Sequence, residues 1–404
     1  MMTPRRVLVT GASVAGPAVA YWLAEVGFAV TVVERAPELR DGGQNIDIRS
    51  TARDVVQRMG LEEAVRAQNT GEVGTRFVDE AGAVVSEFPL RGDGERDGPT
   101  AELEILRGTL ARLLVDACPS SVDWRYGDHV TAVTQDDEGV DVDFAGGTRE
   151  RFDLLVIAEG VGSPTRRLVF GGEPAERALG MYIAYGTISR EPHDDDWWRC
   201  LVTRGGRQIT VRPDNVGSLR ATLSVRVGEP VLDGLDAYGI RRELCRRFAD
   251  LGWEVPRILD GFEYADDLYV DWLRQVRTPV WHRGRVCLLG DAAWCVTPIG
   301  GGGTSLALTG AYVLAAFLSR AGDGGHSEAF TRYDGWMRPL IDAAQKLPPG
   351  VPRIAAPRSG AGVRVLRWGT KVAASSVLRG VTTRLTAGPR AQQELPRLAG
   401  TVGG

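Results

Sequence analysis

The residue pattern with the clearest chemical meaning lies near the amino terminus, where residues 11–16 read Gly-Ala-Ser-Val-Ala-Gly. A β-branched apolar run precedes this turn, and apolar residues at helical spacing follow it. A helix that begins at such a turn presents unpaired N–H groups and partial positive charge to an anion. Glu34 follows the next apolar run, where its carboxylate can accept hydrogen bonds from a ribose. The pattern predicts a dinucleotide site formed by Gly11, Ser13, Val14, Ala15, Gly16 and Glu34.

A second glycine-rich turn follows a strand predicted at 285–289. Asp291 comes soon after that strand, where a carboxylate can bind the hydroxyls of a ribityl chain. Glycines at 300–303 precede a predicted helix and offer bare backbone amides to an anion. The alternative interpretation is a glycine linker between two helices, without a ligand. We expect cofactor contacts from this turn at Gly290, Asp291, Pro298, Gly301, Gly302, Gly303 and Thr304.

Other polar segments have no decisive pattern of their own. Ser50 is expected to cap the helix that follows the loop at 42–49, and Arg107 reads as an ordinary solvated helical residue. The four histidines have no neighbouring nucleophile, so no catalytic acid or base is assigned. No cysteine or histidine pair has metal-ligand spacing, and no metal is expected.

Three segments together resemble the FAD-dependent aromatic hydroxylases, the single-component flavoprotein monooxygenases of the para-hydroxybenzoate hydroxylase type. These segments read GASVAGPAVAYWL with VVERAP near the amino terminus, DLLVIAEGVGSPTR at 153–166, and GDAAWCVTPIGGGG at 290–303. The resemblance covers most of residues 5–345, and it is strongest to the tetracycline-inactivating and antibiotic-tailoring oxygenases. Two positions depart from the family pattern: Glu159 replaces an aspartate, and Trp294 stands where histidine is frequent.

The resemblance implies non-covalently bound FAD and assigns roles to particular residues. Glu34 would hold the adenosine ribose, Arg107 the flavin phosphate or ribityl region, and Asp291 the ribityl chain. The amides after Pro298 would meet the pyrimidine edge of the flavin, and the loop at 42–49 would lie beside the isoalloxazine. The segment at 153–166 would contact both FAD and the nicotinamide cofactor. Further cofactor contacts are expected at Arg35, Gln44, Asp47 and Gly160.

The implied reaction is a monooxygenation. NADPH or NADH would reduce FAD transiently, and dioxygen would then form a flavin hydroperoxide in a dry pocket. One oxygen atom would pass to an electron-rich, aromatic or polyketide-like small molecule. The candidate substrate contacts, between the flavin and an antiparallel sheet, are Tyr185, Trp198, Arg212 and Trp294.

Two other functions compete with this interpretation. A flavin-dependent halogenase would carry a lysine in the first third of the chain and a Trp-x-Trp-x-Ile-Pro motif. This chain has lysine only at Lys346 and Lys371 and lacks the motif, which argues against a halogenase. The remaining alternative is a catalytically inactive FAD protein that binds or sequesters a metabolite.

The order of predicted strands indicates an α/β fold with interleaved domains. Strands expected in one parallel sheet are separated by long stretches of chain, which must form further layers. We expect a Rossmann-like FAD-binding domain from 1–72, 100–178 and 276–345. Alternating polar and apolar residues predict an antiparallel-sheet substrate domain from 73–99 and 179–275.

The remaining segment, 346–404, differs in composition from the rest of the chain. It holds ten basic residues and a single acid, Glu394, for a local net charge of +9. Its recurring apolar residues suit either a helix on a membrane surface or a helix that braces the two domains. We expect the bracing helix.

The overall composition excludes several classes of protein. A formal net charge of -4 gives no basic field for nucleic acid. No run of about 18 apolar residues appears, so no membrane span is expected. Five scattered cysteines do not suggest a disulfide framework, and they fit a cytoplasmic protein whose partners are a small-molecule substrate and dioxygen.

Overall fold

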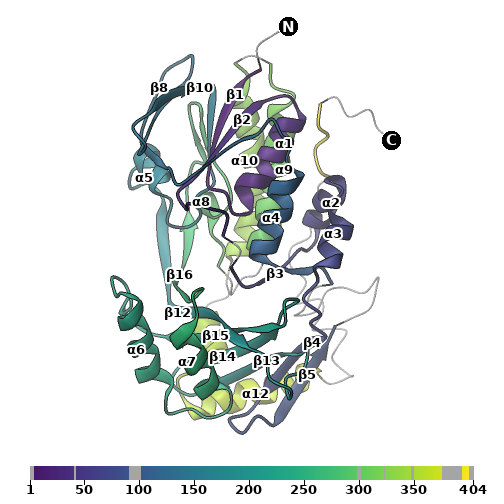
Figure 1. Cartoon of the computed structure of the whole chain (residues 1–404), viewed down its shortest axis with the longest axis vertical. Coiled ribbons are helices and arrows are strands. Elements are labelled where there is room, and N and C mark those ends of the chain that lie inside the picture. Colours follow the sequence, from purple (N-terminus) through teal and green to yellow (C-terminus); the bar gives the residue numbers. More distant parts are fainter. Residues whose placement is uncertain are drawn as a thin grey trace.

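A computed structural model describes residues 4–40, 42–90, 102–297, 302–322, 324–346, 350–374 and 394–399 (Figure 1). Its first layer is a six-stranded sheet in the order β17-β18-β11-β1-β2-β7, parallel except for β17. The two central strands, apart from the exposed Arg6, are buried and consist mainly of Val, Leu and Ile, as expected for a sheet covered on both faces. The strands are β1 Arg6–Thr10, β2 Ala29–Glu34, β7 Asp123–Tyr126, β11 Leu154–Ile157, β17 His282–Arg283 and β18 Val286–Leu288.

Helices cover one side of this sheet, and a three-stranded antiparallel sheet lies on the other side (Figure 1). Helices α1 and α9 lie side by side, and Trp22 meets Tyr312 edge to face with ring centroids 4.9 Å apart. The helices are α1 Ala15–Glu25, α2 Thr51–Arg58, α3 Glu62–Ala67, α4 Arg107–Ala117, α9 Gly303–Leu318 and α10 His326–Gln345. The small sheet is β8 Val130–Gln135, β9 Val140–Phe144 and β10 Arg149–Phe152, with α5 Pro164–Phe170 against β8.

A seven-stranded sheet in the order β16-β12-β15-β14-β13-β4-β5 forms the other half of the molecule. Its neighbouring strands are antiparallel except for β13 and β4, which are parallel. The β4–β5 hairpin comes from an earlier part of the chain and joins the edge of this sheet. Helices α6 Ala237–Phe248 and α7 Val255–Tyr264 bury their apolar residues against this sheet. The strands are β4 Gly74–Val78, β5 Val84–Pro89, β12 Ala175–Ser189, β13 Trp198–Thr203, β14 Arg207–Pro213, β15 Ser218–Arg226 and β16 Tyr269–Arg277.

Strand β12 is 15 residues long and connects the two halves. Residues 175–178 pair with 274–277, and residues 182–185 pair with 269–272, with a register shift between them. Gly180 has φ +69 within the shift, which is typical of a β-bulge. The paired strands therefore continue from one layer into the other, and the domain boundaries expected at 178 and 275 fall inside them.

The carboxyl-terminal segment contacts both halves. Helix α12 Gly360–Ala374 lies against β5 and β13, and α11 Val351–Ala355 lies against β12. Leu395 and Leu398 are buried in the core of the parallel-sheet half. The remaining elements are the two-stranded sheet β3 Asn45–Asp47 and β6 Glu104–Leu106, and the short helix α8 Asp291–Trp294.

The predicted α/β fold class is confirmed, including the parallel sheet, the largely antiparallel second sheet and the carboxyl-terminal helices. The prediction that the side chain of Ser50 caps α2 is wrong. Ser50 occupies the N-cap position of α2, but its backbone has φ 51 and its side chain makes no capping hydrogen bond. None of the helices within the described ranges is long and apolar enough to cross a membrane.

Candidate functional site

The turn between β1 and α1 requires glycine at both ends. Gly11 has φ +96, and a Cβ atom there would lie 2.6 Å from the carbonyl oxygen of Ala158. A Cβ atom at Gly16 would lie 1.8 Å from the carbonyl oxygen of Gly11. The side chain of Ser13, at the position between them, is exposed. The backbone can therefore turn sharply into α1, whose amino terminus starts at Val14 and Ala15.

Glu34 is held at the end of β2 by backbone amides. Its two carboxylate oxygens accept hydrogen bonds from the N–H groups of Ala12, at 2.8 Å, and Ala36, at 2.9 Å. A carboxylate has lone pairs for further hydrogen bonds, so Glu34 can also accept ribose hydroxyls. Arg35 is exposed beside it. A cavity of about 420 Å³ lies next to this point, lined by residues 36–40 and Arg112.

Arg107 begins α4 beside the first glycine turn. Its backbone N–H donates to the carbonyl oxygen of Gln44, and its guanidinium lies 3.5 Å from the hydroxyl of Ser13. Gly43 leaves room for it, because a Cβ atom there would lie 2.8 Å from Nε of Arg107. That Nε is buried and finds no hydrogen-bond partner among the described residues. Burial lowers the pKa of Arg107, and so does the positive charge of nearby Arg40.

Asp291 lies at the start of α8, directly after Gly290, which has φ +63. Asp291 is exposed to solvent, although many protein atoms surround its carboxylate. Desolvation by these surroundings and the charge of Asp271 raise its pKa to about 6, against the opposing charge of Arg107. Asp291 is therefore a carboxyl group that hydroxyl donors could stabilise in its charged form.

The amino terminus of α9 lies beside Asp291. Gly302 is the N-cap with φ +77, and a Cβ atom at Gly303 would lie 3.9 Å from Oδ1 of Asp291. Thr304 follows in the first turn of this 16-residue helix. The two-stranded sheet is attached here, because the hydroxyl of the next residue, Ser305, accepts from N–H of Arg49 and donates to the carbonyl oxygen of Asp47. Pro298 and Gly301 lie outside the described residues.

Tyr269 and Asp271, which sequence reasoning missed, adjoin Arg107 and Asp291. Tyr269 pairs with Tyr185 across β16 and β12, and their rings stack with centroids 6.0 Å apart. Tyr269 keeps 52% of its surface exposed, yet its pKa is raised to about 12, first by partial desolvation and then by the charge of Asp271, against the opposing charge of Arg107. Burial also raises the pKa values of Tyr185 and Asp271. The spacing of Tyr269 and Asp271, two residues apart in a predicted strand, could have indicated that they share one face of the sheet. Their pairing with β12 is not visible in the sequence.

Three of the four candidate substrate residues share one face of the seven-stranded sheet. The strand registers place Tyr185, Trp198 and Arg212 on the face opposite α6 and α7. Arg212 lies over the ring of Trp198 at 4.2 Å. It forms ion pairs with Glu72 at 2.8 Å and Glu104 at 2.5 Å, two carboxylates that are almost completely buried.

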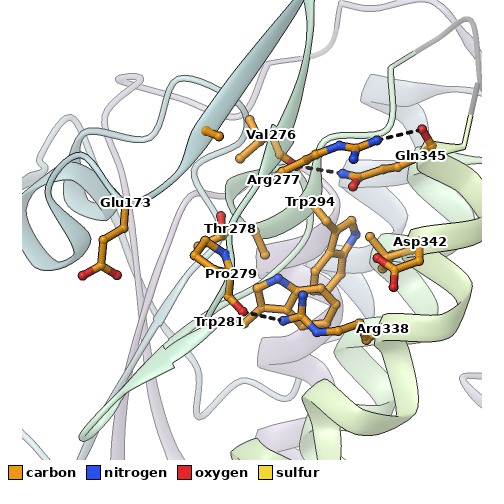
Figure 2. Close-up of a pocket in the computed structure, with 13 residues that line it drawn as sticks. Glu173, Val276, Arg277, Thr278, Pro279, Trp281, Trp294, Arg338, Asp342 and Gln345 are labelled. Atoms are coloured by element: carbon orange, nitrogen blue, oxygen red, sulfur yellow. Dashed lines mark hydrogen bonds between the residues drawn. The ribbon is translucent and has the colours of Figure 1, made fainter.

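Trp294 does not join this face. It is 1% exposed and packs against Trp281 and Tyr333, with ring centroids 4.4 Å and 5.9 Å away. Figure 2 shows it in the wall of a separate cavity of about 350 Å³, next to Arg338 of α10. Trp294 is therefore a core residue that separates this cavity from the interior.

Glu159 stabilises the start of α5. Its carboxylate accepts hydrogen bonds from the hydroxyl of Ser163 at 2.5 Å and from both N–H and hydroxyl of Thr165, at 3.0 Å and 2.6 Å. Gly160 follows with φ +81 and has open space around it. Glu159, which replaces the aspartate of the family pattern, therefore accepts three hydrogen bonds from the start of α5.

The parallel sheet and the glycine turn at 11–16 are typical of dinucleotide-binding proteins, and known proteins identify the family. The family model described as FAD binding domain matches residues 5–344. Flavin-dependent monooxygenase eupH of Phoma sp is 37% identical over 401 residues, covering 93% of this chain and 93% of the relative. The chain belongs to the FAD-dependent aromatic hydroxylase family, and its cofactor is FAD.

Solved structures agree with this assignment. Tetracycline destructase Tet(55) is similar with a TM-score of 0.79 at 31% identity, covering 98% of this chain and 100% of that one. Klebsiella pneumoniae HpxO, complexed with FAD and uric acid, has a TM-score of 0.77 at 22% identity over 95% of this chain and 97% of its own. At that lower identity, HpxO shares the fold.

Proposed function

We propose that this chain is an NAD(P)H-dependent monooxygenase that inserts one oxygen atom of dioxygen into a neutral, electron-rich aromatic or polyketide-like molecule. Bound FAD would supply the reductive activation of dioxygen. The observation that supports the proposal most strongly is the position of Arg107. This partly buried guanidinium, whose buried Nε has no partner among the described residues, lies 3.5 Å from the Ser13 hydroxyl and close enough to Tyr185 and Tyr269 to interact electrostatically with both. A cofactor beside Arg107 would therefore lie near the face of the seven-stranded sheet that carries Tyr185, Trp198 and Arg212.

The residues of the chain would bind and orient FAD. The amino termini of α1 and α9 offer N–H groups to anionic parts of the cofactor, and Arg107 adds a positive charge. Glu34 and Asp291 would accept hydrogen bonds from the ribose and the ribityl chain. The contact at Ser305 would keep β3, which carries Asp47, close to the start of α9. Gln44 would be positioned by the hydrogen bond from Arg107 to its carbonyl oxygen.

The charges on this face of the seven-stranded sheet favour a neutral substrate. Arg212 is paired with Glu72 and Glu104, and Arg220 is paired with Asp214 and Asp267, each at 3.1 Å. The positive charges are therefore already balanced by protein carboxylates. A substrate carboxylate would gain little from these arginines, whereas an aromatic ring can stack on Tyr185 or Trp198.

The decisive experiment follows labelled dioxygen into product. Purified protein loaded with FAD would be incubated with NADPH or NADH and a panel of phenolic polyketides, each tested beside a carboxylated analogue. We expect incorporation of one labelled oxygen atom, with kcat/KM at least about 10-fold higher for the neutral member of a pair. Absence of label in every product would contradict monooxygenase activity. Preference for the carboxylated member would contradict only the charge argument.

The alternative is an FAD protein that binds a metabolite without turnover. It is favoured by Glu159, which is occupied at α5, and by Trp294, which lies in the core where the family often has histidine. Stopped-flow reduction separates the two functions. In a monooxygenase, substrate should accelerate reduction of FAD by NAD(P)H, whereas a sequestering protein should remain oxidised with or without its ligand.

A further inference from the structure

The outer surface of α11 and α12 exposes large apolar side chains. Ile354, Val365 and Trp368 are 63%, 69% and 69% exposed. Val365 and Trp368 are three residues apart on α12 and therefore share a face. On the inner side of α12, Val363 is buried and Arg367 forms an ion pair with Glu80. The helix is thus attached to the protein by one side and presents apolar residues on the other.

Basic residues accompany these apolar side chains. Residues 350–374 contain five basic side chains and no acidic one. Burial lowers the pKa of Arg226, and the charges of Arg358 and then Arg353 lower it further, so three arginines crowd together at the edge of this surface. We call the exposed basic and large apolar residues of 350–374 the C-terminal face, and they are Arg353, Ile354, Arg358, Arg364, Val365, Trp368 and Lys371.

We propose that the C-terminal face binds an anionic lipid surface. Its arginines and lysine would contact lipid phosphates, while Trp368 and Val365 enter the headgroup region. Tryptophan favours this interface because its ring is apolar and its N–H can still bond to water or phosphate. Two copies of the face would bring like charges together, so self-association is disfavoured. Since no helix in the described part of the chain can cross a bilayer, the association is peripheral.

The position of α12 allows this contact without covering the FAD-binding residues. Figure 1 shows α12 at the end of the molecule remote from the parallel sheet and from α1. The proposal is independent of the reaction that the protein catalyses, because it depends on the exposure and charge of α11 and α12 alone.

Vesicle sedimentation tests the proposal with full-length, FAD-loaded protein. Vesicles of phosphatidylcholine alone are compared with vesicles that also contain phosphatidylglycerol. We expect binding to the mixed vesicles that weakens as salt is added. Replacing two charges, in Arg364→Gln with Lys371→Gln, should weaken binding about 25-fold, at about fivefold per charge. Val365→Ser with Trp368→Ser should also weaken vesicle binding, and should reduce the binding that persists at high salt.

Tyr238→Ser is the matched control, because Tyr238 on α6 is also 69% exposed. It should bind vesicles as the wild type does, and FAD content verifies that every variant is folded. Equal binding to neutral and mixed vesicles, or unchanged binding by both double variants, would overturn the proposal. A dimer detected by light scattering that Val365→Ser with Trp368→Ser dissociates, without vesicle binding, would identify a second copy as the occupant instead. Binding to polyglutamate but not to vesicles would identify an acidic protein partner instead.

Discussion

Replacing Arg107 by methionine should weaken FAD binding and stabilise the apoprotein. The wild-type guanidinium is partly buried, forms no ion pair with an acidic side chain among the described residues, and has an Nε without a hydrogen bond. A hydrogen bond to a charged group contributes about 1.5 to 3 kcal/mol, so its loss should raise the Kd for FAD about 10- to 150-fold. Removal of the unsatisfied cation should increase the free energy of unfolding of the apoprotein by about 1 kcal/mol.

The assay combines urea unfolding of the apoprotein with titration of FAD by fluorescence. Arg212→Met provides the matched control, since Arg212 is paired with Glu72 and Glu104. Its replacement removes the positive charge that these two buried carboxylates face, and should lower the free energy of unfolding by about 3 to 5 kcal/mol. If Arg107→Met were instead destabilised and bound FAD as tightly as the wild type, Arg107 would be a structural residue and our account of the site would be wrong.

Three further predictions concern stability. Asp291→Asn should stabilise the apoprotein above pH 6, because the raised pKa of about 6 makes the charged wild-type carboxyl unfavourable. After allowance for solvent screening we expect about 1 kcal/mol, lost as the pH falls from 6 towards 4, measured by urea unfolding across that range. Glu159→Ala should lower the free energy of unfolding by about 2 kcal/mol and change the Kd for FAD little, because it removes three hydrogen bonds at α5. Gly11→Ala should lower the free energy of unfolding by more than about 3 kcal/mol, because the added Cβ atom would lie 2.6 Å from the carbonyl oxygen of Ala158. Gly60→Ala, at a position with φ +71 and open space, should lower it by about 1 kcal/mol, and thermal unfolding measures both.

The sequence predicted the local parts of the site better than the contacts between them. The turn after β1 could be predicted because its glycines, its helix and Glu34 follow one another within a short stretch. Taken as a single residue of a predicted helix, Arg107 gave no indication that it belongs to the site. Its place beside Gly43 and Ser13 depends on how β6 pairs with β3, and only the resemblance to the family indicated it.

Other residues show why long-range contacts escaped sequence reasoning. Tyr269 and Asp271 gain their importance from pairing with β12, more than 80 residues earlier in the chain. Arg212 could be assigned to a sheet strand, but its partners Glu72 and Glu104 lie in distant segments. A hydrophobic pattern predicts which positions are buried, but it does not predict which residues pack against them.

The uninterrupted β12 has a practical consequence for engineering this chain. Because β12 and β16 run through both layers, no single flexible linker separates the piece that holds the cofactor from the piece that faces it. A chimera with a related protein would have to exchange the β4–β5 hairpin together with everything from β12 to β16, leaving the intervening chain in place. Exchanging either block alone would leave the junction between β13 and β4 mismatched, so recombination should succeed in pairs of blocks and fail in single ones.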